Sequence, residues 1–215
     1  ELGIISNILE FRFDYFYNTP LNRVWGRVYT CNHDGPFTLQ EEEIEEARFV
    51  TVDEALQLHE DTPITPDGLQ ILDLLIRQEQ NPTYFLHGLD SSGQGTKGSF
   101  FSKTYPDIIR PDFTGNLEDR NQAFKAIMQE RTNICLIGSS FGGLMATCTA
   151  ISSPAVLRKV ILLAPALNFE RFKPPRERSN VPTTLIIGEN DTVCPPGIVI
   201  PLAEQTFSDL TVQMT

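Results

Sequence analysis

The chain has 215 residues, a hydrophobic content of 40% and a formal net charge of −11. This length allows one large domain or two small ones, and the hydrophobic content is sufficient for a packed core. No apolar run approaches the ~18 residues that a membrane span requires, and a chain without a basic surplus is a poor partner for nucleic acid. We therefore expect a protein that neither crosses a membrane nor binds nucleic acid.

The negative charge is concentrated in the first part of the chain. Residues 1–80 hold 16 Asp and Glu against 5 Lys and Arg, whereas residues 81–215 hold 12 of each kind. This asymmetry predicts two modules of different character.

The four cysteines are scattered and form no Cys-x-x-Cys pair. Two of them, Cys135 and Cys148, lie in segments that we expect to be buried, so the sequence favours a reduced, cytoplasmic protein over a disulfide scaffold. The sequence opens without methionine and closes on the alternating segment 210–215. We interpret both ends as internal to a longer parent chain.

The first module is predicted to begin with two strands. Residues 8–16 alternate apolar and polar side chains with many aromatic rings, which is typical of a strand. Residues 24–31 are predicted as a second strand, followed by the turn-forming segment 32–36. Thr51 and Glu54 have the spacing of a capping box, which predicts the start of a short helix.

A second helix is predicted from Pro66 onwards, because proline is favoured at the first helical position. Its expected apolar face consists of Leu69, Leu72, Leu75 and Ile76.

This order of elements resembles the C-terminal part of a Nudix hydrolase. Residues 1–4, Glu-Leu-Gly-Ile, match the end of the Nudix box, which reads Glu-Glu-x-Gly-hydrophobic. The resemblance implies a truncated α+β Nudix-like domain over residues 1–79, in which Glu1 is one of the glutamates that hold Mg²⁺ on a diphosphate. The other glutamates of the box are absent from the sequence. Because hard cations need several oxygen ligands together, we do not expect residues 1–79 to bind metal by themselves.

The acidic run 41–46 has two readings. It is either a solvated surface, which we favour, or part of a metal site.

Residues 78–82 are polar and end in proline, and we predict an interdomain linker at 80–82. Beyond it, strands alternate with helices, which indicates an α/β domain with a parallel sheet covered on both faces. The expected strands are 84–86, 107–110, 133–137, 158–165, 183–188 and 210–215, and the expected helices are 97–105, 116–129 with an Asn116 cap, and 144–150.

The chain is organised around the segment Gly138-Ser-Ser140-Phe-Gly142. A Gly-x-Ser-x-Gly sequence between a buried strand and a helix predicts a sharp turn, with φ above zero at the serine and its hydroxyl raised clear of the sheet. The two glycines are needed because their backbones crowd each other. Ser140 is therefore a candidate nucleophile, and a plain tight turn is the alternative.

Three segments together resemble the α/β-hydrolase superfamily: the Leu-His-Gly-Leu-Asp-Ser-Ser segment 86–92, the serine turn 138–143 and the segment 188–191. Within the superfamily they look like the small esterases of the YqiA type. The resemblance covers residues 83–215.

The resemblance implies a role for each matching position. Ser140 is the nucleophile, Asp191 is the acid that orients a histidine, and the backbone N–H groups of Leu89 and Phe141 form the oxyanion hole. Asp191 has an alternative reading as a turn aspartate.

The histidine of the triad is where the sequence departs from the family. Its three histidines are His33, His59 and His87, and His87 matches the family's loop-shaping histidine. The family places its base after the last strand, where this sequence ends. We therefore expect an α/β-hydrolase domain cut before its catalytic histidine, with no working triad in residues 1–215.

The sequence thus predicts a serine hydrolase of an acyl ester or thioester in the intact parent chain, without a cofactor. The alternatives are Nudix-type diphosphate hydrolysis with Mg²⁺ as the main activity, or a non-catalytic binding module. The segment 166–181 is too short for a large lid, so we expect an open pocket for a small-molecule substrate. The segment 166–181 contains four cations, Arg171, Lys173, Arg176 and Arg178. They either attract an anionic substrate or belong to a solvated loop, and we favour the solvated loop. The oligomeric state is not indicated.

Overall fold

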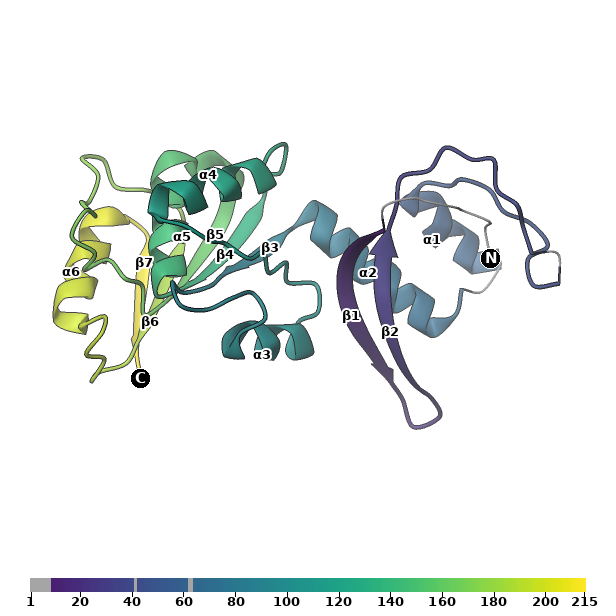
Figure 1. Ribbon diagram of the computed structural model, residues 1–215, viewed down its shortest axis with the longest axis horizontal. Helices are drawn as coiled ribbons and strands as arrows, with labels where there is room; N and C mark the ends of the chain where they lie inside the picture. Colours follow the sequence, from purple (N-terminus) through teal and green to yellow (C-terminus); the bar gives the residue numbers. More distant parts are fainter. Residues whose placement is uncertain (1–8, 41, 62–63) are drawn as a thin grey trace. The chain divides into compact units, whose positions relative to one another are not determined.

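The chain forms two units, and the division between them falls between Ile76 and Arg77 (Figure 1). The computed structural model describes residues 9–40, 42–61 and 64–215. The two units are Glu1–Ile76 and Arg77–Thr215. Glu1, the predicted metal ligand, lies outside the described residues. No helix in the described ranges is long and apolar enough to cross a membrane.

Residues 78–82, which include the predicted linker, comprise the end of a helix and the two residues that follow it. Helix α2 (Pro66–Gln80) continues beyond the division between the units. Gln78 is buried, its side-chain amide donates to the carbonyl of Asp107 at 3.1 Å, and its own carbonyl accepts from Arg131 at 3.1 Å. The polar groups of Gln78 are thus satisfied within the second unit, whereas Glu79, Gln80 and Asn81 are exposed.

The first unit is built on an antiparallel hairpin of β1 (Glu10–Asn18) and β2 (Arg23–Thr30), followed by α1 (Val52–Asp61) and α2. Both predicted strands are confirmed. One face of the hairpin packs on α2 around a small buried cluster of Phe13, Tyr15, Val28 and Leu74.

The capping box at the start of α1 is confirmed. The backbone N–H of Glu54 donates to the Thr51 hydroxyl at 3.2 Å, and the backbone N–H of Thr51 donates to the Glu54 carboxylate at 2.6 Å. The Thr51 backbone N–H, with a smaller contribution from its hydroxyl, lowers the pKa of Glu54.

The buried face of α2 differs from the predicted one. Leu74 is its buried apolar side chain, and Ile71 and Leu75 pack beside it. Apolar side chains occur on all sides of this helix, so periodicity by itself does not select the face that meets the hairpin.

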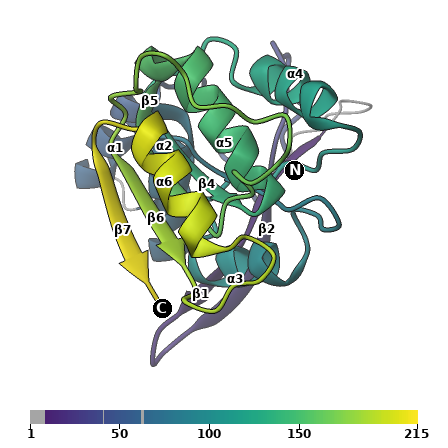
Figure 2. The same cartoon turned by 90° about the vertical axis from the view of Figure 1, so that its left-hand side faces the viewer.

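The second unit is a parallel five-stranded sheet in the order β3-β4-β5-β6-β7 (Figures 1 and 2). β4 is buried along its whole length, as its apolar sequence predicts for a parallel strand. The strands and helices of this unit are β3 (Thr83–Leu86), α3 (Thr96–Thr104), α4 (Leu117–Ile127), β4 (Ile134–Ser139), α5 (Phe141–Ser152), a 3₁₀ turn (Pro154–Val156), β5 (Leu157–Leu163), β6 (Thr183–Ile187), α6 (Pro196–Thr206) and β7 (Leu210–Met214).

The two faces of this sheet are covered unequally. Side chains of α4, α5 and α6 form one large core with the first face, including Phe124, Leu144 and Val199. On the second face, α3 contributes Phe101 to a smaller cluster around Phe85, and the side chains of β5 there remain half-buried. The predicted coverage of both faces is thus extensive on one face and limited on the other.

The strand predicted at 107–110 is reduced to a single bridge, in which Ile109 pairs with Tyr84. Its N–H donates to Thr83 and its carbonyl accepts from Phe85, at 2.8 and 2.9 Å. Prolines at 106 and 111 enclose this segment, and proline supplies no donor to a longer ladder. The helix predicted at 116–129 is α4, and the Asn116 side chain caps it by accepting from the N–H groups of Glu118 and Asp119.

Candidate active site

Ser140 lies on the sharp turn between β4 and α5. β4 ends at Ser139, α5 begins at Phe141, and Ser140 between them has φ 54° and ψ −117°. A positive φ is rare for a residue with a side chain and is retained where the surrounding structure enforces it. The predicted conformation of Ser140 is therefore confirmed.

Two glycines make this turn possible. A Cβ atom at Gly138 would collide with the carbonyl of Gly142, and a Cβ atom at Gly142 would collide with the carbonyl of Leu86. The strand, the helix and the neighbouring strand thus approach each other too closely for side chains at these positions. The approach of Gly138 to Gly142 is the crowding that the sequence predicts, whereas the approach of Gly142 to Leu86 of β3 is not predicted.

Hydrogen bonds from the end of β5 hold the backbone of Ser140. Its N–H donates to the carbonyl of Leu163 at 3.0 Å, and its carbonyl accepts from Ala166 at 3.0 Å. Ala164, between these two residues, also has a positive φ of 44°. Strained backbone conformations thus occur at the ends of two adjacent strands, an arrangement frequent at functional sites.

Asp191 follows β6 and lines the same pocket as Ser140, of about 410 Å³. One carboxylate oxygen, Oδ1, accepts from the backbone N–H groups of Val193 and Cys194 at 2.9 and 2.8 Å. These two bonds fix the orientation of the carboxylate. Thr215 lines the pocket as well, and its carbonyl accepts from Glu189. The structure thus brings together the predicted nucleophile and the predicted acid.

Cys194 also lines this pocket, a position that its sequence does not predict. Its side chain is buried, and Ser140 lines the same pocket. Burial raises the pKa of the Cys194 thiol, the charge of Asp191 raises it further, and the Ser140 hydroxyl acts in the opposite direction. A thiol kept protonated in this way is a weak nucleophile, so Ser140 has no strong competitor here.

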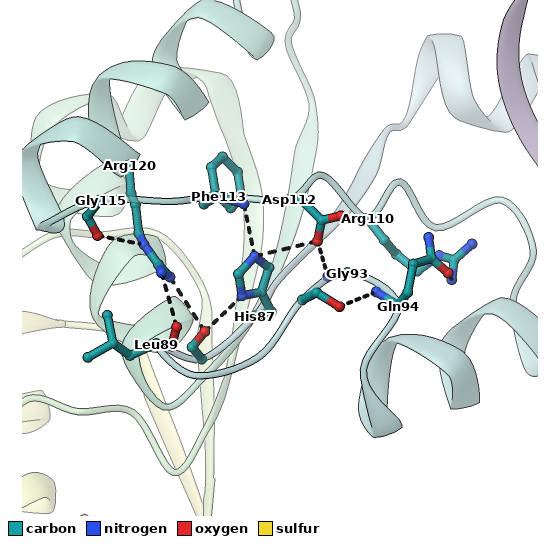
Figure 3. A network of polar contacts seen from close by, with 11 residues as sticks. His87, Leu89, Gly93, Gln94, Arg110, Asp112, Phe113, Gly115 and Arg120 are labelled. Carbon is teal, nitrogen blue, oxygen red and sulfur yellow. Dashed lines mark hydrogen bonds and ion pairs between the residues drawn. The ribbon is translucent and has the colours of Figure 1, made fainter.

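The loop after β3 runs beside Ser140. A Cβ atom placed on Gly88 would lie 3.6 Å from the Cβ of Ser140. Figure 3 shows how His87 holds this loop: its Nε2 accepts from the backbone N–H of Phe113 at 2.9 Å, and its Nδ1 lies 2.7 Å from the carbonyl of Gly88. Since Nε2 accepts, Nδ1 carries the proton and donates to Gly88.

Both nitrogens of His87 are thus engaged in shaping the loop, as the resemblance implies, and neither faces Ser140 as a free base. Asp112 lies 3.8 Å from Nε2, but its carboxylate accepts from the backbone N–H of Gly93 at 2.5 Å. Because Nε2 is the acceptor for Phe113, the Asp112 contact is not an ion pair with a protonated ring.

The N–H groups predicted for the oxyanion hole belong to Leu89 and Phe141. Within the described part of the chain, neither N–H has a hydrogen-bond acceptor. Phe141 is the first residue of α5, so its N–H is one of the unpaired donors at the helix N-terminus.

Lys97, near the start of α3, lines the pocket and was not singled out from the sequence. It is the one cation among the lining residues of this pocket. The four cations of the 166–181 segment do not line it, and all four are exposed: Arg171, Lys173, Arg176 and Arg178. The reading of that segment as a solvated loop fits these exposures.

The first unit offers a different surface. The acidic residues Glu42, Glu43, Glu45 and Glu46 are all exposed. Among the described residues, no group of three or more His, Cys, Asp or Glu is placed to hold a metal ion. The described residues therefore do not fit a Mg²⁺ site.

The fold of the second unit is the α/β-hydrolase fold, with a serine at its sharp strand-to-helix turn. Solved structures share this fold. A YdeN-like hydrolase of Pectobacterium atrosepticum superposes with a TM-score of 0.51 and 21% identity, covering 68% of this chain and 82% of its own. A monoacylglycerol lipase of Paleococcus ferrophilus superposes with a TM-score of 0.50 and 16% identity, covering 64% and 84%.

Sequence comparisons agree with both resemblances. The model of the Uncharacterised protein family (UPF0227) matches residues 83–184. An uncharacterized Nudix hydrolase of Pseudomonas aeruginosa is 41% identical over 76 residues, which is 35% of this chain and 45% of the relative. The uncharacterized Nudix hydrolase YfcD of Escherichia coli is 32% identical over 78 residues, or 36% and 42%. The chain thus spans less than half the length of these curated relatives.

Proposed function

We propose that the parent chain is a serine hydrolase that cleaves an acyl ester or thioester through an acyl-enzyme on Ser140. The observation that carries the proposal is the position of Ser140. It stands at positive φ between β4 and α5, directly before Phe141, in a pocket that also contains Asp191, and the loop of Gly88 and Leu89 passes it at Gly88.

In the first step, a base removes the proton from the Ser140 hydroxyl as Oγ bonds to the carbonyl carbon of the substrate. The negative charge that develops on the carbonyl oxygen is stabilised by the N–H groups of Leu89 and Phe141. The same base then protonates the departing alcohol or thiol, which leaves the acyl group on Ser140. Water, deprotonated by the base, cleaves this ester and restores Ser140. The chemistry requires no cofactor.

The base in this proposal is a histidine supplied by residues of the parent chain after Thr215. Asp191 orients its imidazole, because two backbone amides hold the carboxylate in one direction. Thr215 lines the pocket together with Ser140 and Asp191, so a segment that continued from it would start at the site.

Lys97 supports a preference for substrates that carry a negative charge. It is a lining residue of the pocket, and in this proposal its ammonium group attracts a carboxylate or phosphate on the acyl or leaving group.

The test compares the parent chain with the protein of residues 1–215. The parent chain is expected to hydrolyse p-nitrophenyl acetate, and Ser140→Ala is expected to lower kcat by about 10⁴-fold or more. Ser152→Ala, an exposed serine at the other end of α5, serves as the matched control and is expected to leave kcat unchanged.

The protein of residues 1–215 is expected to show no turnover that depends on Ser140. Turnover by the parent chain that survives Ser140→Ala would rule out the acyl-enzyme. Turnover by residues 1–215 that requires both Ser140 and His87 would show that His87 leaves its bonds and acts as the base.

Diphosphate hydrolysis by the parent chain is the second candidate, because of the 41% identity to a Nudix hydrolase over 76 residues. Hydrolysis of a nucleoside diphosphate derivative by the parent chain in the presence of Mg²⁺, unaffected by Ser140→Ala, would support it.

A further inference from the structure

Arg120, on α4, is a buried arginine whose side chain is 4% exposed. Its guanidinium donates to three backbone carbonyls: Nε to Gly115 at 3.1 Å, Nη1 to Gly88 at 3.4 Å and Nη2 to Leu89 at 3.1 Å (Figure 3). Within the described residues no carboxylate forms an ion pair with it. A buried charge without a counter-ion is costly, so its contacts indicate what the arginine does.

Two of the three carbonyls belong to the loop that passes Ser140. The carbonyl of Gly88 and the N–H of Leu89 are parts of the same planar trans peptide group, so they point in opposite directions. Arg120 and His87 both donate to this carbonyl, from Nη1 at 3.4 Å and Nδ1 at 2.7 Å. Two donors on the carbonyl side therefore fix the direction in which the Leu89 N–H points.

Arg120 also contacts the side chain of Phe141, whose backbone N–H is the second donor assigned to the oxyanion hole. The guanidinium carbon lies 5.4 Å from the centroid of the Phe141 ring, in the geometry of a cation–π contact. The ring itself is buried and meets Phe169 edge-on at 5.7 Å. Arg120 is thus in contact with both residues whose backbone N–H groups the proposed mechanism assigns to the oxyanion hole.

We propose that Arg120 is a positioning residue that sets the oxyanion hole, by fixing the Leu89 peptide and packing on Phe141. This inference rests on the proposed function. Donors that are already aligned need no reorganisation when charge develops in the transition state, and they stabilise it more than mobile donors do. Arg120 acts through these donors and does not touch the substrate.

A purely structural role for Arg120 would leave a different signature. α4 is already held by the Asn116 cap and by the buried ring of Phe124. Loss of Arg120 should therefore affect the transition state more than the folded state, so kcat should fall while KM stays nearly constant.

The experiment measures kcat and KM of the parent chain with p-nitrophenyl acetate for Arg120→Gln and Arg120→Lys. Arg120→Gln is expected to lower kcat by about 10- to 100-fold and to change KM by no more than about threefold. A misaligned N–H donor still provides part of the transition-state stabilisation that is lost completely when the donor is deleted. Arg120→Lys keeps the charge but not the planar fork, and is expected to recover part of kcat. Arg131→Gln is the matched control, because Arg131 also donates to a carbonyl, that of Gln78. It is expected to leave kcat unchanged.

Affinity for a trifluoromethyl ketone gives a second readout. Its carbonyl carbon bonds to Ser140 Oγ and leaves a negatively charged oxygen in the oxyanion hole. Arg120→Gln is expected to weaken this inhibitor by the same factor as kcat, and to leave the affinity for the matching amide, which forms no oxyanion, unchanged.

Thermal unfolding identifies variants that do not fold. If Arg120→Gln is unfolded, Arg120→Lys and Phe141→Leu carry the test. Phe141→Leu keeps the backbone N–H, removes the ring beneath the guanidinium, and is expected to lower kcat severalfold.

A folded Arg120→Gln variant with unchanged kcat, or with a raised KM at constant kcat, would overturn the inference while the Ser140 mechanism stands. Wild-type turnover that does not depend on Ser140 would instead remove the proposed function itself. The two failures are therefore distinguishable.

Discussion

Aromatic side chains are used differently in the two units of the chain. In the second unit the ring of Phe124 is fully enclosed and meets Tyr84 edge-on at 5.4 Å, within a core that spans three helices and the sheet. In the first unit Phe16 and Trp25 stack at 4.5 Å on the outer face of the hairpin, and Trp25 is 73% exposed. The second unit thus derives its order from a large core, whereas the first relies on a small buried cluster and surface contacts.

The hairpin's outer face shows how such a surface is held. Arg27 donates to Asp14 at 2.7 Å and lies 5.4 Å from the ring centroid of Phe11. Asp14 and the hydrogen bond to Tyr29 raise the pKa of Arg27 further above its usual value. Exposed pairs of this kind contribute little to stability. The comparison therefore predicts that substitutions in the two units have different consequences.

Deletion of core volume is expected to give the largest effect. Leu136→Ala in β4 removes a fully buried side chain and should destabilise the second unit by about 2–5 kcal/mol. Because each unit has its own buried cluster, the first unit should keep its unfolding midpoint. Trp25 is the one tryptophan in the sequence and reports on the first unit by fluorescence, while far-UV circular dichroism is dominated by the larger second unit.

Phe13→Ala is the reciprocal variant, since Phe13 is fully buried in the first unit. It is expected to lower the midpoint temperature of the unfolding transition reported by Trp25 fluorescence. The midpoint of the circular dichroism transition of the second unit should not change. Transitions that move together in both variants would show one cooperative unit and break the comparison.

A smaller effect is expected for the pocket cation. Lys97→Met should lower kcat/KM of the parent chain for p-nitrophenyl hemisuccinate by about fivefold, or about 1 kcal/mol, as for an exposed ion pair. The uncharged acetate ester should be hydrolysed as before, and added salt should reduce the difference between the two esters.

Lys103→Met is the matched control, because Lys103 is exposed in the last turn of the same helix and does not line the pocket. Equal losses for the charged and the uncharged ester would contradict a role for Lys97 in recognising a negative charge.

The smallest effect is expected at the cap of α1 in the first unit. The backbone and hydroxyl of Thr51 lower the pKa of Glu54, so ionised Glu54 stabilises the folded state above the usual glutamate pKa. That contribution should be lost as the pH falls through the lowered pKa. Glu54→Gln should therefore decrease the midpoint of the Trp25 transition at pH 7 and have no effect in strong acid. Glu43→Gln, in the exposed acidic run, is the control and should leave the midpoint unchanged at both pH values. If Glu54→Gln lowered the midpoint equally at pH 7 and in strong acid, the ionised carboxylate would be excluded as the source of the effect.

Local features of the fold and site could be predicted from the sequence. The Ser140 turn follows from an apolar strand, two glycines and a helix within about a dozen residues, and its positive φ is confirmed. The caps at Thr51 and Asn116 are confirmed for the same reason, because each involves residues no more than three positions apart. Local backbone conformation is determined by neighbouring residues, so it can be predicted from the sequence.

Other features were decided by the tertiary structure. No motif in the sequence indicates a role for Arg120, yet it is buried and donates to the carbonyl of Gly88, 32 positions earlier. Cys194 and Ser140 line one pocket because the start of α5 and the loop after β6 meet at the same edge of the sheet, and Lys97 of α3 lines this pocket as well. The sequence by itself determined which turns and caps form, since these depend on the chemistry of adjacent residues. The tertiary structure decided which side chains meet across the sheet, because long-range packing selects the buried face of each helix and the edge of the sheet where the loops converge. The local sequence periodicity does not predict these contacts.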